Sequence, residues 1–436
     1  MIIDQWRADL TTVQPVSIAA PESASTNATA DLPVVCDPWG TPQVPVTGLV
    51  GSLRAHAELE LGPARCRTIF GADLALATDD DEQQVQPSSV RFLGSALTMP
   101  GPVAVVTQTA VGRWSAAAAD KSLRAREAIP IGATVSVYLT AEDLPDAALA
   151  DFKTALTTWR PVLGGSYTTG LGDAKVTHIW HRRLDLAKQT DLAIWLAGGG
   201  PKSYTGESWD VWESVARGLS EHAHSWAFLI DGDLRIGTGK PRPSEAATSA
   251  KRGSDYVIPG SAWKGVFRSR AEFILRTCGM PTCNSTDEDC CTEPTCPTCT
   301  LFGWSGRAGS TGEVGARGTL RFHTSTVTEA QTPTRSHVAI DRFTGGARRG
   351  QLYKEKVLCG GRATLTVDIP PDAPTWAQSL LDWVTLDIHD GFVGIGHGTS
   401  RGMGTLRLVD ADAVRARAGD LTQLMRDSQE EEVPRG

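Results

Sequence analysis

The pattern of apolar and polar residues predicts both strands and helices in the C-terminal half of the chain. Residues 225–237, SWAFLIDGDLRIG, alternate as in a β-strand. In AWKGVFRSRAEFILR, residues 262–276, the apolar side chains of Trp263, Val266, Phe267 and Ile274 recur at i, i+3, i+4 and i+11, which predicts a helix with one buried stripe. Ser261 is the expected N-cap of this helix.

The rest of this half completes a recognisable order of elements. Three further strands are expected at 318–327, 362–369 and 402–409, and residues 373–388 are expected to form a helix that runs into a strand. The order βαββαβ predicts an α+β, ferredoxin-like unit, a layout that RNA-recognition (RRM) domains also use.

Four segments of the N-terminal half recur in the same order in the C-terminal half, which predicts a tandem duplication. VPVTGLVGSLR (44–54) aligns with IPGSAWKGVFR (258–268), and TIFG (68–71) with TLFG (300–303). The segment from Val111 aligns with the segment from Ile340, and GGSYTTGLG from Gly164 with GHGTSRGMG from Gly396. We therefore expect two tandem βαββαβ domains.

The expected boundaries follow from the repeat and from the composition of the connecting segments. The first domain is expected at 1–185 and the second at 222–415, joined by a linker at 186–221 whose end, WDVWESVARGLSEHA, is expected to form a helical bridge. The second copy carries a cysteine-rich insertion at 278–299, and residues 416–436 are expected to form an acidic tail.

Composition narrows the class of protein. The formal net charge of −8 does not favour nonspecific nucleic-acid binding, although local clusters of Lys and Arg can still supply it. No apolar run is long enough to span a membrane and the first residues do not resemble a signal peptide, so we expect a cytoplasmic protein with no membrane partner.

Six of the nine cysteines crowd into the insertion, and this predicts a metal site. They are Cys278, Cys283, Cys290, Cys291, Cys296 and Cys299. In a reducing compartment such crowding favours zinc over disulfides, and four of the six are expected to form a closed, structural Cys₄ site that includes the CxxC pair Cys296 and Cys299. The alternative is a thiol-rich loop without metal.

The start of the predicted helix at 262–276 has the features of an anion site. A helix N-terminus offers free N–H groups and a positive dipole end, and Lys264 and Arg268 add full charges, so a phosphate is the expected ligand. Thr47 and Arg54 repeat part of the pattern in the first copy, and Arg401 lies in a glycine-rich loop near the end of the second. The alternative is a capped helix with a solvated basic face.

Together, IPGSAWKGVFR, CPTCTLFG, VAIDRFTGGARRGQLYKEKVL and GIGHGTSRGMGTLRL resemble, in order and spacing, the RAMP superfamily of CRISPR-associated proteins, and most of all the backbone subunits of type III effector complexes. The resemblance implies that the chain binds a CRISPR guide RNA, contacts single-stranded target RNA and assembles with other type III effector subunits. It also implies a zinc-binding insertion before LFG. The residues expected to bind RNA are Thr47, Arg54, Arg113, Ser261, Lys264, Arg268, Arg342, Arg348 and Arg401.

The resemblance also implies a β-hairpin thumb in each copy, which is pushed through the guide–target duplex. Residues 335–356 fit the thumb of the second copy, because six Lys and Arg face two acids around a Gly-Gly turn at 345–346. In the first copy, the segment that contains Arg113 adds Trp114, which is either a stacking residue or part of the core.

Some members of the family cleave the target RNA with a loop aspartate. ADLPVVCDP resembles that loop and places Asp31 at the catalytic position, where a carboxylate could act with Mg²⁺ or another divalent ion; Asp37 is expected to form a turn. The second copy offers only Glu245 and Asp255, and Asp255 is the second candidate site. Asp31 could instead be a solvated loop carboxylate.

These residues allow three functions to be compared. The leading hypothesis is a double backbone subunit that holds guide RNA and acts as a metal-dependent endoribonuclease on the target. The second is a catalytically inactive RNA-binding scaffold of the same kind of complex. A zinc enzyme that acts on a small molecule is disfavoured, because the sequence clusters thiols and offers no open site with His or carboxylate ligands.

Overall fold

The computed structural model describes residues 1–20, 30–72, 86–112, 118–120, 122–198, 203–204, 209–215, 222–237, 246–283, 296–305, 315–421 and 423. Its contacts divide the chain into two compact units. The first unit comprises Met1–Val106, Ala125–Tyr167 and Leu171–Gly218, and the second comprises Thr107–Arg124, Thr168–Gly170 and Leu219–Gly436.

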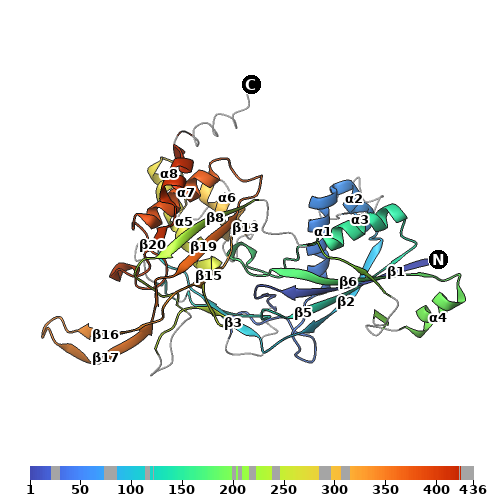
Figure 1. Cartoon of the computed structure of the whole chain (residues 1–436), viewed down its shortest axis with the longest axis horizontal. Helices are drawn as coiled ribbons and strands as arrows, with labels where there is room; N and C mark the ends of the chain where they lie inside the picture. Colours follow the sequence, from blue (N-terminus) through green and yellow to red (C-terminus); the bar gives the residue numbers. More distant parts are fainter. Residues whose placement is uncertain are drawn as a thin grey trace. The chain divides into compact units, whose positions relative to one another are not determined.

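The first unit is a five-stranded sheet with helices on one face (Figure 1). The strands in sheet order are β2 (Val90–Thr98), β5 (Thr134–Glu142), β1 (Ile2–Thr12), β6 (Ala174–Asp185) and β7 (Asp210–Trp212), and neighbours pair antiparallel. The helices are α1 (Val46–Leu61), α2 (Pro63–Phe70) and α3 (Asp146–Thr157). Trp6 is fully buried between sheet and helices and meets the ring of Phe152 edge-on, with 4.8 Å between the centroids.

The second unit has a longer sheet, also covered by helices (Figure 1). The strands in sheet order are β10 (Lys251–Arg252), β11 (Asp255–Ile258), β15 (Ser325–Thr328), β19 (Arg362–Asp368), β8 (Ala223–Ile230) and β20 (Leu406–Leu408), with β14 (Arg321–Phe322) paired to β19. The helices are α5 (Gly260–Thr277), α6 (Pro297–Phe302), α7 (Ala377–His389) and α8 (Ala411–Ala418). The predicted helical stripe is confirmed at Trp263 and Phe267, which are fully buried in the core.

The two units have the same topology. In chain order the first runs β1, α1, β2, β5, α3, β6, and the second runs β8, α5, β15, β19, α7, β20. The corresponding sheet orders are β2-β5-β1-β6 and β15-β19-β8-β20. The α+β class is therefore confirmed, and each unit shows the βαββαβ order that the apolar pattern predicts.

In each copy of the repeat, a two-stranded ribbon lies in chain order between the second and third main strands. In the first copy this ribbon is β3 (Ala104–Gln108) with β4 (Arg124–Ala128), and in the second it is β16 (Thr334–Ile340) with β17 (Ala347–Lys356). The β16–β17 hairpin projects from the second unit (Figure 1). The remaining short strands are β12 (Gly303–Ser305) with β13 (Gly315–Arg317) and β9 (Asp233–Leu234) with β18 (Leu358–Cys359).

Several local predictions are wrong. The helical bridge expected at 209–223 is replaced at Asp210–Trp212 by β7, because Trp212 is buried against the core and the segment pairs with β6. A helix lies earlier in the linker, at α4 (Gln189–Ala197). α7 continues as a helix to His389 and does not run into a strand. None of the described helices is long and apolar enough to cross a membrane.

Candidate nucleic-acid interface and metal centre

Asp31 is hydrogen-bonded to β4, the second strand of the ribbon in the first copy. Its backbone N–H donates to the carbonyl of Ala125 at 2.9 Å, and its Oδ2 accepts from the N–H of Ala125 at 2.7 Å. The carboxylate is exposed to solvent. Asp37 forms a turn, as predicted, because its Oδ1 accepts from the backbone N–H groups of Trp39 and Thr41 at 2.9 and 2.8 Å.

The backbone ladder beside Asp31 has a counterpart in the second unit. Leu32 donates to the carbonyl of Ala125 and accepts from the N–H of Glu127, at 3.1 and 2.8 Å. Ala247 bonds in the same way to Lys354 and Lys356, at 3.1 and 2.8 Å. Since Leu32 and Ala247 occupy equivalent positions, the residue equivalent to Asp31 is Ala246, which has no carboxylate.

Asp255 lies elsewhere. It begins β11 in the turn of the β10–β11 hairpin, where it is exposed and accepts from Ser254 Oγ at 3.0 Å. Glu245 falls outside the described residues.

The helix starts differ from the expectation of a free anion site. α1 and α5 have Pro45 and Pro259 at their N-caps, so Ser261 is not the N-cap, because Pro259 already supplies the carbonyl that accepts from the N–H of Ala262. The N–H of Gly260 donates to Thr324 Oγ1 at 3.4 Å. Thr47 is exposed and Ser261 is half-buried, both on the first turns of their helices.

Lys264 is the cation nearest the start of α5. Its Nζ donates to Thr168 Oγ1 at 2.7 Å. Burial, reinforced by the positive charge of Arg268, lowers the pKa of Lys264 to about 8. This ammonium is therefore poorly solvated, and a phosphate oxygen beside it would favour its charged form.

Arg54 and Arg268 both point inward. Arg54 Nη2 donates to the carbonyl of Gly71 at 3.2 Å, and Arg268 Nη1 donates to the carbonyl of Gly303 at 2.5 Å. These glycines end α2 and α6 with φ of 77° and 80°, and a Cβ on either would collide with backbone atoms. Arg268 also pairs with the buried Glu272 at 3.0 Å. Both arginines thus hold the helix that follows their own.

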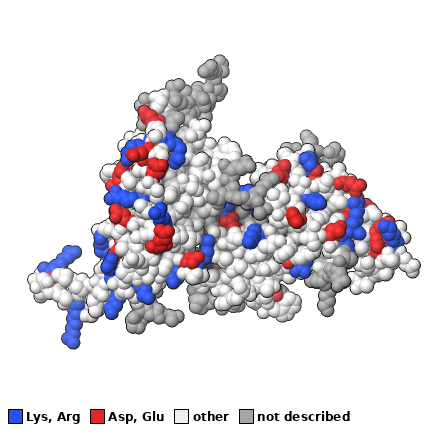
Figure 2. All heavy atoms as spheres, viewed as in Figure 1, with Lys and Arg blue, Asp and Glu red and all other residues white. Residues whose placement is uncertain are grey.

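The β16–β17 hairpin presents its cations to solvent. Arg342 and Arg348 are exposed, and Figure 2 shows Lys and Arg side chains along this projection. Asp341 Oδ1 accepts from the N–H groups of Thr344 and Phe343, which holds the pKa of Asp341 below its usual range. The turn that Asp341 closes leaves Phe343 99% exposed. Arg113 and Trp114, predicted for the other ribbon, lie outside the described residues.

A polar cluster that the sequence did not reveal joins the base of this hairpin to the glycine-rich loop. Arg401 donates to Tyr353 Oη at 3.1 Å and lies 2.9 Å from His397 Nε2. Because Arg401 can only donate, this nitrogen of His397 accepts, and the imidazole is neutral. Burial and the neighbouring Arg235 and Arg401 lower the pKa of His397 accordingly. The contact between Arg401 and Tyr353 depends on the register of the β16–β17 hairpin, which the sequence does not give.

The carboxylate of Glu355, on β17, is almost fully buried. Glu355 is 1% exposed, accepts from Arg235 Nε at 2.6 Å and lies 2.7 Å from His337 Nε2, at an angle unsuited to a hydrogen bond. These contacts fix the root of the hairpin to the second unit.

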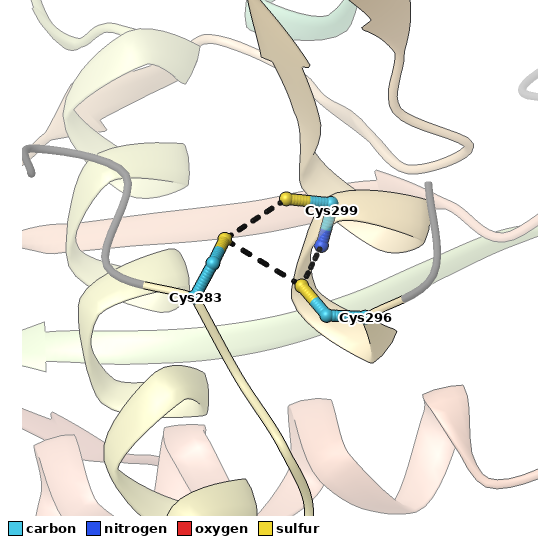
Figure 3. Close-up of side chains that lie close together, drawn as sticks. All are labelled: Cys283, Cys296 and Cys299. Carbon is cyan, nitrogen blue, oxygen red and sulfur yellow. Dashed lines mark hydrogen bonds between the residues drawn. The ribbon is translucent and has the colours of Figure 1, made fainter. Parts of the chain in front are cut away.

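Three of the six insertion cysteines converge (Figure 3). Cys283 Sγ lies 3.1 Å from Cys299 Sγ and 3.6 Å from Cys296 Sγ, and all three sulfurs lie within 4.8 Å of one another. Cys296 caps α6, since its sulfur accepts from the N–H of Cys299 at 3.4 Å. Cys278 lies at the C-terminus of α5, outside this cluster, and Cys290 and Cys291 fall outside the described residues.

The donor set fits a soft metal ion such as zinc. Three sulfurs at these spacings match three corners of a tetrahedral thiolate site, and Cys296 and Cys299 come from one CxxC turn. Arg268 Nη2 lies 3.7 Å from Cys299 Sγ, where a cation stabilises thiolate charge. Cys278, Cys290 and Cys291 remain candidates for the fourth ligand.

Comparison with known proteins places the second unit in a family. No curated protein matches the chain. The sequence model of the RAMP superfamily matches residues 228–407, which begin within β8 and end within β20. This segment contains α5, the cysteine cluster, the β16–β17 hairpin and the glycine-rich loop. Residues 228–407 are therefore a RAMP superfamily domain, and this implies a CRISPR-associated protein that binds RNA.

Proposed function

We propose that the chain is a tandem fusion of two backbone units of a type III CRISPR effector complex, which binds guide RNA and cleaves complementary target RNA through Asp31 in the first unit. The observation that carries the cleavage proposal is the position of Asp31, whose exposed carboxylate accepts one hydrogen bond, and whose backbone N–H donates another, at the root of a ribbon. The remaining partners would be the other subunits of that complex.

The tandem fusion is supported by equivalent bonds in the two glycine-rich loops. The N–H of Gly165 donates to the carbonyl of Ser17 at 2.8 Å, and the N–H of His397 donates to that of Arg235 at 2.8 Å. Leu163 donates to Gly172 at 2.8 Å, and Ile395 donates to Gly404 at 3.0 Å. With the equal sheet orders, these bonds support two copies of one fold.

The guide-binding surface would use the exposed cations of the second unit. Arg342 and Arg348 on the hairpin are free to meet phosphates, and Arg401 lies at its base. Phe343 at the tip is suited to wedge between bases, because an aromatic ring that is already exposed can stack without unfolding its surroundings. Arg54 and Arg268, which hold α2 and α6, would contribute to RNA binding only indirectly.

The chemistry would be an attack by the ribose 2′-oxygen of the target on the adjacent phosphorus. The 2′-OH gives its proton to a base, the new O–P bond forms, and the bond from phosphorus to the 5′-oxygen breaks. The leaving 5′-oxygen takes a proton from solvent, and the products are a 2′,3′-cyclic phosphate and a 5′-OH. Asp31 would orient the 2′-OH or accept its proton. A divalent ion such as Mg²⁺, held by Asp31 and the target phosphate, would neutralise the developing charge.

An inactive scaffold is the second candidate function. The bond from the Ala125 N–H to Asp31 Oδ2 favours it, because this bond alone gives the carboxylate a structural role. The two functions share the RNA surface and differ only in whether Asp31 touches the target.

Cleavage mapping tests the proposal. The reconstituted complex is incubated with end-labelled target RNA and magnesium, using the native chain, Asp31→Ala and Asp255→Ala. We expect Asp31→Ala to lose one product with guide binding intact, and Asp255→Ala to keep every product, since Ala246 occupies the equivalent position. An unchanged ladder with Asp31→Ala would leave the scaffold function, and a product lost with Asp255→Ala would restore the second site.

A further inference from the structure

The first unit contains a cavity of about 440 Å³ that none of the RNA features above uses. It lies on the face of the sheet opposite α1, α2 and α3, because Gln5 and Tyr138, which line it, alternate with the core residues Trp6 and Val137. α4 lies on this side of the sheet (Figure 1) and contributes Ile194, Trp195 and Leu196 to the wall. A cavity of this size accommodates a small organic ligand.

The walls of the cavity are aromatic. The rings of Tyr138 and Tyr204 lie 5.1 Å apart between centroids, and Trp195 is the third aromatic residue of the lining. Tyr204 is buried, and its Oη donates to the carbonyl of Leu139 at 3.3 Å. Burial raises the pKa of Tyr204 to about 12, so its hydroxyl remains protonated at neutral pH. Such walls favour a flat ring.

One cation lies among these rings. Arg182 Nη2 donates to Gln5 Oε1 at 2.7 Å and to the carbonyl of Ser203 at 2.8 Å, and its guanidinium stacks on Trp209 at 4.4 Å from the ring centroid. No carboxylate among the described residues pairs with it. Burial accordingly lowers the pKa of Arg182. A partly buried guanidinium whose partners in the described part of the chain are all neutral is stabilised by an anion.

The floor of the cavity is kept open by a glycine. Gly94 pairs with Tyr138 across the β2–β5 ladder, so both face the cavity. A Cβ at Gly94 would meet no atom within 4 Å, and the backbone there is not in the left-handed region. A larger side chain at this position would therefore fill the cavity without backbone strain.

We propose that this cavity binds a nucleotide, with its base against Tyr138 and Trp195 and its phosphate on Arg182. The aromatic walls favour a flat ring and the Arg182 guanidinium favours an anion, and a nucleotide supplies both together. The nucleotide is either free or one unpaired residue of a bound RNA strand. The inference does not depend on cleavage by Asp31, since it uses none of the same residues.

Binding to the full chain tests the site. Calorimetric titrations use AMP, CMP, adenosine and ribose 5-phosphate, with the native chain, Arg182→Gln, Gly94→Leu and the control Arg65→Gln. Arg65 lies on α2, on the face of the sheet opposite the cavity, and is paired with Asp151. We expect Arg182→Gln to weaken AMP binding by about 10- to 100-fold and to spare adenosine, because only AMP carries the phosphate. Gly94→Leu should abolish binding of both, and Arg65→Gln should change neither.

A second arm separates the two sources of the nucleotide. An RNA oligonucleotide carrying 5-iodouridine is cross-linked to the full chain, and the adducts are mapped by mass spectrometry. Adducts at Tyr138 or Trp195 without saturable AMP binding identify an RNA residue as the occupant, and saturable AMP binding identifies a free nucleotide. The proposal is overturned if the native chain shows neither saturable AMP binding nor these adducts. It is also overturned if Gly94→Leu, at an unchanged melting temperature, binds nucleotide and cross-links as the native chain does.

Discussion

Asp31 and Ala125 are joined by two hydrogen bonds, one from each backbone N–H, and the second of them ends on the Asp31 carboxylate. The carboxylate therefore anchors its loop to β4 and presents an acidic group to solvent at the same time. Substitution by alanine removes both properties, so a loss of cleavage in that variant cannot by itself separate them.

Asp31→Asn separates anchoring from chemistry. The asparagine side-chain oxygen can still accept from the Ala125 N–H, whereas its neutral amide neither accepts a proton nor holds a divalent ion well. We expect Asp31→Asn to abolish the same product as Asp31→Ala, with a loop that resists proteolysis as the native loop does. Cleavage retained by Asn and lost by Ala would assign Asp31 to anchoring.

The cysteine cluster predicts one bound zinc per chain and a dependence of stability on it. We expect Cys283→Ser or Cys299→Ser to lower zinc content, measured by elemental mass spectrometry, and to lower the melting temperature by about 10 °C or more, because a structural zinc contributes several kcal/mol. Chelation of the native chain should produce the same shift. Cys36→Ser, outside the cluster, is the control. Native zinc content in Cys299→Ser would exclude this cysteine as a ligand.

We predict that removal of the Arg268 side chain lowers the stability of the folded chain. Its side chain is a charged partner of Glu272, which is 2% exposed, and it also binds the carbonyl of Gly303. Arg268→Ala takes one ion-pair partner from a buried carboxylate and a donor from the Gly303 carbonyl, so we expect the free energy of unfolding to fall by about 3–5 kcal/mol in denaturant titrations. The exposed Arg276 on the same helix provides the control Arg276→Ala, expected within about 0.5 kcal/mol of native. Equal stability of the two variants would contradict this role.

The sequence predicted the element order because the two periodicities are local properties of the chain. The helix of the second copy and the glycine-rich loops follow from patterns within about 15 residues. The two ribbons were expected from the resemblance to the RAMP superfamily. The cysteine cluster was predictable for the same reason, since Cys296 and Cys299 share one turn. The resemblance to the RAMP superfamily rested on these motifs and is confirmed for residues 228–407.

The directions of side chains depend on partners distant in sequence and were not predictable. Arg54 and Arg268 have the spacing of an exposed basic face, but their guanidinium groups donate to carbonyls at the end of the next helix. The bulge between Val338 and Ile340 shifts the register of the β16–β17 hairpin, so counting outward from the turn does not pair His337 with Tyr353. The equivalence of Ala246 with Asp31 likewise appears only in the backbone ladder.

Lys264 predicts a pH dependence of stability. Its pKa is about 8 in the folded chain and near 10.5 in the unfolded chain, so between these values the unfolded state binds more protons and stability rises with pH. Burial of the charged form is most costly below pH 8. We expect Lys264→Met to gain up to about 3 kcal/mol over the native chain at pH 7, and this gain to disappear as the pH approaches 10.5. A difference that stays constant with pH would show that Lys264 titrates normally.

Phe343 predicts a defect in RNA handling without a defect in folding. Because its ring is 99% exposed, Phe343→Ala should change the free energy of unfolding by less than about 0.5 kcal/mol. If the ring wedges between bases, the variant should reduce the fluorescence increase of a 2-aminopurine placed in the target, since unstacking raises that signal. Leu59→Ala is the matched control, because Leu59 is also highly exposed but lies on α1. Equal signals from the native chain and Phe343→Ala would exclude a wedge at this tip and leave the hairpin a purely electrostatic grip through Arg342 and Arg348.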